Sequence, residues 1–298
     1  MRLAVLFVHG VGESRAAWAQ PFIASLAGRI RAQVAQLAPH AALPRDMARI
    51  VGAHWGAVLT GRRRTLRRIL TRGAGPGRPG PWWRSRWKPL EQTLIADYLG
   101  DLLGYLDPRI ASAVDRCLTE TLARLAGPGP ARQRIPLTII AHSLGTVVSS
   151  HYVWDHAKAR RARQARGFHG RFRFDNFFTL GSPMALFSLK YGGPEAFKAP
   201  VRVEHASGRW INCFDTDDPL GLPLRPLNAA YRRAVAADVP VETGGYLLAH
   251  RGYFTEPRTL DLISRKLALD WLAGNAALPP RQVSAHYAAY DRGLRPHG

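Results

Sequence analysis

Short apolar runs alternate with longer stretches of helical periodicity along this chain. Leu3–Val8 is apolar throughout and leads into a glycine-containing turn, which is typical of a strand buried on both faces of a parallel sheet. Apolar residues then recur every three or four positions from Trp18 to Leu37, which predicts an amphipathic helix. Such alternation predicts an α/β fold with a mostly parallel, doubly wound sheet and right-handed crossovers. The other expected strands are Ile50–His54, Leu137–Ala141, Phe177–Leu180 and Trp210–Phe214.

The segment 55–125 differs from its surroundings and is expected to be a helical, cap-like insertion within a single domain spanning 1–298. It has an arginine-rich start, a glycine- and proline-rich middle and the sequence Trp82-Trp83-Arg84-Ser85-Arg86-Trp87-Lys88. Helical patterns follow from Leu94 to Leu106 and from Ile110 to Leu125. The tryptophan-rich stretch suits either an anionic membrane surface or docking on the protein's own surface.

The composition limits the class of protein. The chain has 298 residues, of which 46% are hydrophobic and eight are tryptophan, so it can bury a sizeable core and is unlike an intrinsically disordered chain. Two isolated cysteines, Cys117 and Cys213, exclude a disulfide scaffold and argue against structural zinc. The net charge of +21 favours anionic partners. No zinc-finger, basic-zipper or RNA-binding signature is present, so specific nucleic-acid recognition is not expected.

The amino-terminal sequence does not resemble a secretory signal. The apolar run Leu3–Val8 is short and leads into His9-Gly10-Val11-Gly12-Glu13 rather than into small residues. No apolar run approaches the ~20 residues that span a bilayer. We therefore expect a cytoplasmic protein. Peripheral attachment to an anionic membrane surface is compatible with that location.

The sharpest motif is Ala141-His142-Ser143-Leu144-Gly145, between an expected strand and an apolar helix start. It matches the nucleophile elbow, G-x-S-x-G, in which small neighbours two positions before and after the serine relieve crowding at a strained turn. Ala141 replaces the first glycine and is still small. The elbow would expose the hydroxyl of Ser143 and aim the N–H of Leu144 at a developing oxyanion. The ordinary alternative is a serine that caps a helix.

A second oxyanion donor is expected after the first strand. His9-Gly10-Val11-Gly12 follows Leu3–Val8, and the N–H of Val11 is the candidate donor. The alternative interpretation, a dinucleotide-binding turn, would need a third glycine where Arg15 stands. No phosphate-binding Gly-Lys-Ser/Thr motif appears either.

A nucleophilic serine needs a base, and the base needs an acid. Asp218 is the preferred acid because Pro219 holds its backbone extended; Asp217 is the second choice and Asp215 the third. His250, beside Gly244-Gly245 and Gly252, is preferred as base over His286 and His297. The remaining histidines are assigned to packing or the surface, and no metal site is expected because His151 and His156 lack a carboxylate at helical spacing. Those packing or surface histidines are at positions 9, 54, 142, 151, 156, 169 and 205.

Together these motifs resemble the α/β-hydrolase superfamily, closest to bacterial serine lipase- and esterase-like members. The matching pieces run in the family's order from residue 3 to about 254. The resemblance implies a mostly parallel sheet and hydrolysis of a carboxylic ester, lipid-like or otherwise hydrophobic, through an acyl-enzyme on Ser143. It implies the triad Ser143, Asp218 and His250 and requires no metal or organic cofactor. The pieces are Val8-His9-Gly10-Val11-Gly12, the elbow 141–145, Leu180-Gly181-Ser182-Pro183, Asp218-Pro219 and His250 with Gly252-Tyr253.

Two other classes of function stay open on sequence grounds. An acyltransferase or thioesterase would use the same triad with a different acceptor or leaving group. A non-catalytic protein could keep the fold and bind anionic partners through its arginines, because a fold alone does not grant activity.

Overall fold

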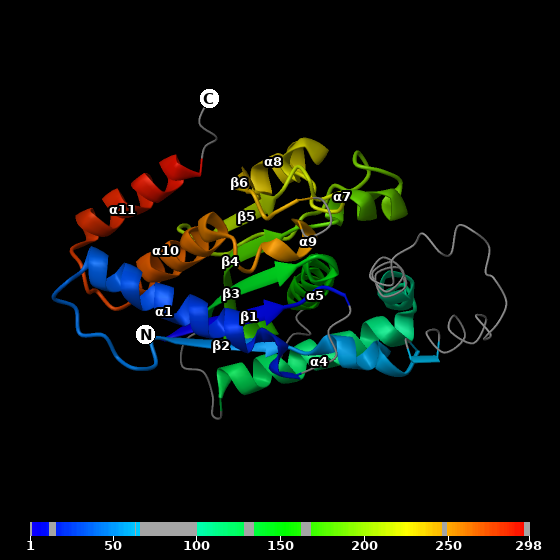
Figure 1. The fold of residues 1–298 in the computed structure, drawn as a ribbon, viewed down its shortest axis with the longest axis horizontal. Helices are drawn as coiled ribbons and strands as arrows, with labels where there is room; N and C mark the ends of the chain where they lie inside the picture. Colours follow the sequence, from blue (N-terminus) through cyan, green and yellow to red (C-terminus); the bar gives the residue numbers. More distant parts are fainter. Residues whose placement is uncertain are drawn as a thin grey trace.

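The computed structural model describes residues 2–11, 16–62, 64–65, 100–127, 134–161, 168–245 and 249–294. Within these residues, six parallel strands form one sheet with helices on both faces, which confirms the α/β class (Figure 1). All five strands expected from the apolar runs are present. The strands are β1 (Leu3–Val8), β2 (Ala48–Ala53), β3 (Ile135–His142), β4 (Phe172–Leu180), β5 (Arg209–Phe214) and β6 (Ala237–Pro240).

The strand order, β2-β1-β3-β4-β5-β6, places a switch in winding direction between β1 and β3. From β1 the chain moves to one side to form β2, and then crosses to the other side to form β3 and the rest. In open α/β sheets, ligands bind beyond the carboxyl ends of the strands at such a switch point. The loop after Val8 and the turn after His142 therefore face each other where a ligand is expected.

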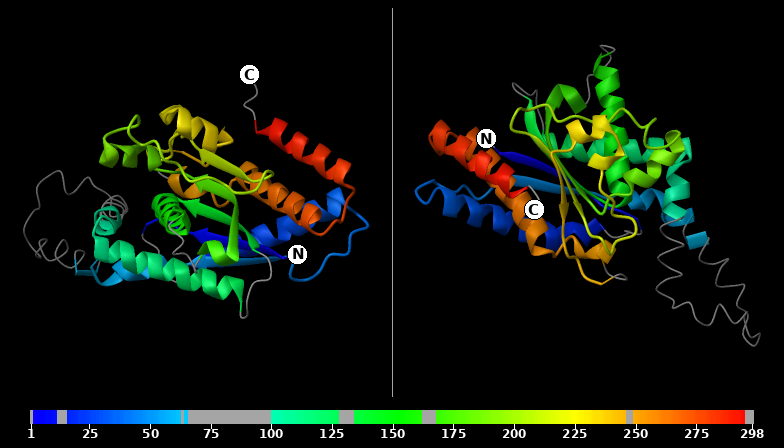
Figure 2. Two further views of the ribbon diagram at one scale, coloured as in Figure 1. Left: turned by 180° about the vertical axis from the view of Figure 1, so that it is seen from behind. Right: turned by 90° about the horizontal axis from the view of Figure 1, so that it is seen from above.

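Successive side chains along each strand point to opposite faces of the sheet and pack against different helices. On β1, Leu3, Val5 and Phe7 pack with α1 (Gln20–Leu37) and α10 (Pro257–Gly274). The intervening Ala4, Leu6 and Val8 pack with α4 (Pro108–Ala126) and α5 (Leu144–Arg161). Figure 2 shows these two layers on opposite sides of the sheet. The remaining helices are η1 (Ala16–Ala19), η2 (Trp55–Leu59), α6 (Phe168–Arg171), α7 (Met184–Phe187), η3 (Ser188–Tyr191), η4 (Arg225–Leu227), α8 (Ala229–Ala234), α9 (Ala249–Gly252) and α11 (Pro280–Gly293).

Strand β6 was not expected, because its sequence Ala-Asp-Val-Pro contains two residues that disfavour strands. It forms by pairing with β5, from Ile211 opposite Ala237 to Phe214 opposite Pro240. Proline is tolerated there because β6 is the edge strand, where no further ladder partner needs its N–H. Pairing with β5 thus forms a strand in a segment whose own sequence does not favour one.

The expected insertion 55–125 divides into different parts. Helix α4 buries Ile110, Val114, Leu118 and three further side chains against the strands, so this part is a core helix of the sheet rather than a cap. Residues 66–99, including Trp82, Trp83 and Trp87, lie outside the described residues. Among the helices that the structure describes, none is both long and apolar enough to cross a membrane.

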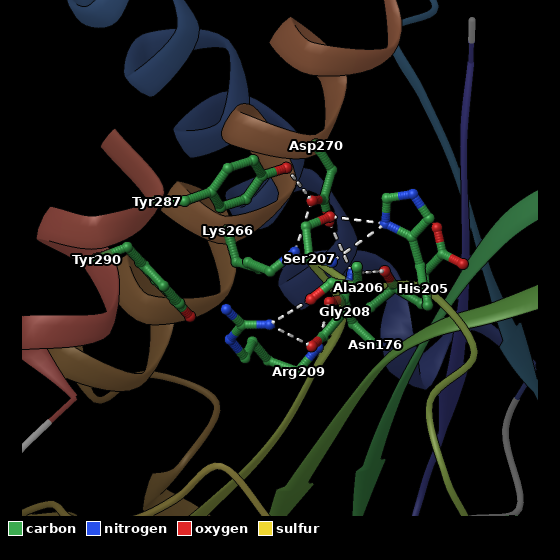
Figure 3. Close-up of polar contacts among 12 residues, drawn as sticks. Asn176, His205, Ala206, Ser207, Gly208, Arg209, Lys266, Asp270, Tyr287 and Tyr290 are labelled. Atoms are coloured by element: carbon green, nitrogen blue, oxygen red, sulfur yellow. Dashed lines mark hydrogen bonds and ion pairs between the residues drawn. The ribbon is translucent and has the colours of Figure 1, made fainter. Parts of the chain in front are cut away.

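A buried polar cluster joins α10 and α11 to the middle of β4 (Figure 3). Lys266 is fully buried, and its Nζ lies 2.5 Å from Oδ1 of Asp270. Tyr287 donates to the same oxygen at 2.6 Å, and Asn176 donates to Oδ2 at 2.7 Å. Burial lowers the pKa of Lys266, and the adjacent carboxylate opposes that shift. The cluster anchors the two carboxyl-terminal helices away from the switch point.

Candidate active site

The turn at Ser143 has the geometry of an elbow. Its φ is 53°, a left-handed value that serine rarely adopts. The strain is held in place because the N–H of Ser143 donates to the carbonyl of Leu180 at 2.9 Å, and the Ser143 carbonyl accepts from Thr146. A Cβ on Gly145 would stand 2.3 Å from the carbonyl oxygen of His9. Only glycine therefore lets β1 end this close to the start of α5.

Three residues from distant parts of the chain meet at this turn. Nε2 of His250 lies 2.7 Å from Oγ of Ser143. Nδ1 of His250 lies 3.0 and 2.9 Å from the two carboxylate oxygens of Asp218. A carboxylate can only accept, so Nδ1 carries the proton and Nε2 presents its lone pair to the serine hydroxyl. The structure thus brings together Ser143, His250 and Asp218 in the arrangement needed for general-base activation of a nucleophile.

Asp218 lies in a tight, polar enclosure. Besides His250, it accepts from the N–H of Leu220 at 3.0 Å and from the hydroxyl of Tyr253 at 2.9 Å. Burial acts to raise the pKa of Asp218, but these hydrogen bonds outweigh it and hold the pKa below its ordinary value. A Cβ on Gly181 or Gly221 would stand within 3 Å of this carboxylate. Asp218 is therefore kept ionised and fixed in orientation behind the imidazole.

The other two aspartates of this turn have different positions. Asp217 is exposed, and its N–H donates to Asp215, so the structure does not bring this alternative acid to His250. Asp215 is buried and accepts from both the N–H and the hydroxyl of Thr243, at 2.6 and 2.7 Å. The same hydroxyl lies 2.6 Å from the carbonyl oxygen of Ala249. Asp215 thus supports the segment that carries His250.

The candidate oxyanion donors lie on the two loops that meet at the switch point. Leu144 is the first residue of α5, so its N–H has no acceptor within the helix and lies at the positive end of the helix dipole. Gly10 contacts Ser143 directly, since a Cβ there would lie 2.6 Å from the serine Cβ. Val11 follows Gly10, and its N–H stays a predicted donor.

His9, which the sequence assigned to packing, orients this loop. Its Nδ1 lies 2.6 Å from the carbonyl oxygen of Gly10, and its Nε2 accepts from the N–H of Gly56. Its ring stacks on Trp55 at 5.2 Å between centroids. Because a trans peptide points its C=O and the following N–H in opposite directions, holding the carbonyl of Gly10 also fixes the N–H of Val11.

His142 is the residue whose position sequence reasoning missed. It was assigned to packing because it fills a variable slot of the motif, yet its Nε2 lies 2.6 Å from the carbonyl oxygen of His250. Of the other two candidate bases, His286 is on α11 and not beside Ser143, and His297 lies outside the described residues. The two ring nitrogens of His151 lie within hydrogen-bond distance of the hydroxyls of Tyr105 and Tyr191. Among the described residues, no cluster of three metal-ligating side chains occurs.

No protein-family model matches this chain, and no curated protein matches it.

Proposed function

We propose that this protein is a serine hydrolase of the α/β-hydrolase fold that cleaves a carboxylic ester through an acyl-enzyme on Ser143. The observation that carries the proposal is the continuous hydrogen-bonded chain from the Ser143 hydroxyl through His250 to Asp218. Two further observations support it. The three residues follow the chain order serine, acid, histidine of α/β-hydrolases, and the serine has a strained, positive φ.

In acylation, Oγ of Ser143 forms a bond to the ester carbonyl carbon while Nε2 of His250 takes the hydroxyl proton. Negative charge then develops on the carbonyl oxygen, and the N–H groups of Leu144 and Val11 stabilise it. The bond to the alcohol oxygen breaks, and His250 donates its proton to that leaving oxygen. Asp218 stabilises the transient imidazolium and keeps the ring oriented.

In deacylation, a water molecule attacks the acyl carbon while His250 removes one of its protons. The bond between the acyl carbon and Oγ of Ser143 breaks, and His250 returns the proton to the serine. The acid product leaves, and the hydroxyl is restored for another cycle. The residues named here suffice for each proton transfer, so the proposal invokes no cofactor.

A hydrophobic acyl ester is the substrate class that we propose. Exposed leucines lie on the helical residues 100–105 and on η3, with Leu103 65% and Leu189 70% exposed. These two segments are joined through His151, which bonds Tyr105 and Tyr191. Exposed apolar groups of this kind suit contact with a lipid-like substrate. With a net charge of +21, the proposal extends to peripheral contact with an anionic lipid surface.

Covalent labelling tests the nucleophile. A fluorophosphonate probe should label the wild type and leave Ser143→Ala unlabelled. Ser149→Ala is the matched control, because Ser149 is buried on helix α5, which begins directly after Ser143, and its Oγ has no hydrogen-bond partner among the described residues. That variant should label like the wild type. An unlabelled wild type, or equal labelling of Ser143→Ala, would refute the proposal.

An ester series of rising acyl length then tests the reaction. The wild type should release acid and alcohol, with activity rising toward longer acyl chains, and Ser143→Ala should not. Analysis of the acyl product separates hydrolysis from transfer to an added alcohol or thiol. Release of no free acid from any ester would contradict ester hydrolysis.

A further inference from the structure

The imidazole of His142 connects the nucleophile strand to the segment that carries the base. His142 ends β3 directly before Ser143, and its side chain is buried. Its Nε2 lies 2.6 Å from the main-chain carbonyl oxygen of His250, and the two imidazole centroids are 4.9 Å apart. A carbonyl oxygen can only accept, so Nε2 of His142 carries a proton and donates it.

The surroundings of His142 leave the ring little freedom. Phe254 packs edge-on against it at 4.6 Å between centroids, and Tyr253 lies 6.0 Å away. A Cβ on Gly10 would stand 3.1 Å from its Nδ1, so the loop after β1 also lies close against the ring. Burial lowers the pKa of His142 to about 3, and the nearby His250 contributes in the same direction. The ring is therefore neutral, and its hydrogen bond to His250 selects the tautomer protonated at Nε2.

The segment that carries His250 needs such an anchor. Helix α9 has 4 residues, too few for a helix to be rigid by itself. The carbonyl of Ala249 lies 2.6 Å from the hydroxyl of Thr243, but that hydroxyl has one proton to share between Ala249 and Asp215. The next carbonyl, that of His250, accepts from Nε2 of His142, and this bond helps to fix the position from which the imidazole projects toward Ser143.

We propose that His142 is a positioning residue whose Nε2–H holds the backbone of His250 so that the His250 imidazole stays within hydrogen-bond distance of Ser143. The inference rests on the proposed function of the triad. His142 acts through His250 and makes no contact with the reacting atoms. A displacement of about 1 Å between a base and its nucleophile can reduce the rate about a hundredfold, so the anchor affects the chemical step more than substrate binding.

The sharpest test compares His142→Gln with His142→Met. The two side chains have similar length and both remove the ring, but only glutamine offers an N–H at a reach similar to that of Nε2. We expect His142→Met to lower kcat roughly ten- to a hundredfold with KM within about twofold, and His142→Gln to recover most of that loss. His142→Phe, which keeps a ring without a donor, should resemble the methionine variant.

His156→Met is the matched control. His156 lies on α5, is half-buried and contacts Asp115 and Tyr152, and it belongs to no part of the site described above. At equal melting temperature its kcat should stay near that of the wild type. Wild-type kcat in His142→Met, or equal loss in the methionine and glutamine variants, would overturn the proposal.

A spectroscopic measurement on the wild type does not depend on how the variants fold. The ¹⁵N spectrum of the histidine side chains should show His142 neutral and protonated at Nε2, with a slowly exchanging proton, across the pH range of activity. A ring protonated at Nδ1 would refute the positioning role. A wild type that neither labels with fluorophosphonate nor cleaves any ester would refute the triad's function instead, which separates the two failures.

Discussion

Gly10 and Ser143 lie so close that a methyl group on residue 10 would stand 2.6 Å from the Cβ of Ser143. One residue follows β1 and the other follows β3, so the contact joins the two loops at the switch point of the sheet. The backbone after β1 can pass the nucleophile only because residue 10 has no side chain. The same approach places Val11 beside the strained turn that bears the hydroxyl.

Gly10→Ala should therefore disable the site more than it destabilises the fold. We expect kcat to fall by about a hundredfold or more, because the added methyl displaces either the serine or the loop. The free energy of unfolding should fall by about 1–3 kcal/mol. Gly28→Ala is the control, since a Cβ on Gly28 of α1 meets nothing within 4 Å and should slightly stabilise the helix. Ester kinetics and thermal unfolding measure both effects, and wild-type kcat in Gly10→Ala would contradict the described contact.

Tyr253 connects two of the aspartates. Its hydroxyl donates to Asp218 and accepts from the N–H of Asp215, each at 2.9 Å. Burial raises the pKa of Tyr253, so the hydroxyl keeps its proton. Tyr253→Phe should lower kcat about tenfold and cost about 1–3 kcal/mol, because a buried N–H loses its acceptor. Tyr290→Phe, which removes another buried hydroxyl bond, should cost stability and leave kcat unchanged; an equal loss of kcat in both variants would contradict a specific role for Tyr253.

The lowered pKa of Asp215 predicts that the stability of the protein depends on pH. Burial acts to raise the pKa of Asp215, but hydrogen bonds from Thr243 and the N–H of Asp217 hold it below its ordinary value of 3.8. A carboxyl whose pKa is lower in the folded state stabilises the protein above 3.8, and this contribution is lost as the pH falls through the folded pKa. Asp215→Asn should therefore be less stable than the wild type at pH 6, with the gap narrowing from pH 4 downward. Denaturant unfolding at each pH measures the gap; a gap that widens toward low pH would reverse the assigned direction.

Asp270 should matter for stability and not for catalysis. Its carboxylate accepts from Lys266, Tyr287 and Asn176 in the cluster of Figure 3. Asp270→Ala leaves a fully buried ammonium without its counter-ion and should cost about 3–5 kcal/mol. Lys266→Met should cost less, because the carboxylate keeps two neutral donors. Denaturant unfolding ranks the variants, and kcat of the folded fraction should stay near wild type in both. A cost for Lys266→Met larger than that for Asp270→Ala would contradict this ranking.

The apolar runs and the elbow motif were sufficient to predict the α/β class, five of the strands and the residues that meet at Ser143. This information is local. A run of apolar residues specifies a buried strand, and small residues around a serine specify a sharp turn, whatever lies elsewhere in the chain. The order of serine, acid and histidine came instead from the resemblance to α/β-hydrolases, which limited the candidate acids and bases to residues that follow Ser143.

Only the tertiary structure determined the directions of the side chains and the contacts between residues that are distant in the sequence. Asp215, Asp217 and Asp218 stand together in sequence, yet only the last points at His250, because Tyr253 and the N–H of Leu220 hold it there. Helix α4 covers the sheet and β6 extends it through contacts that their own sequences do not encode. The motif alone gave His142 no specific role. Its hydrogen bond to the carbonyl of His250 forms because the fold brings these two residues together. A hydrogen bond depends on the positions of both partners. Partners that are far apart in the sequence come within bonding distance only in the folded structure.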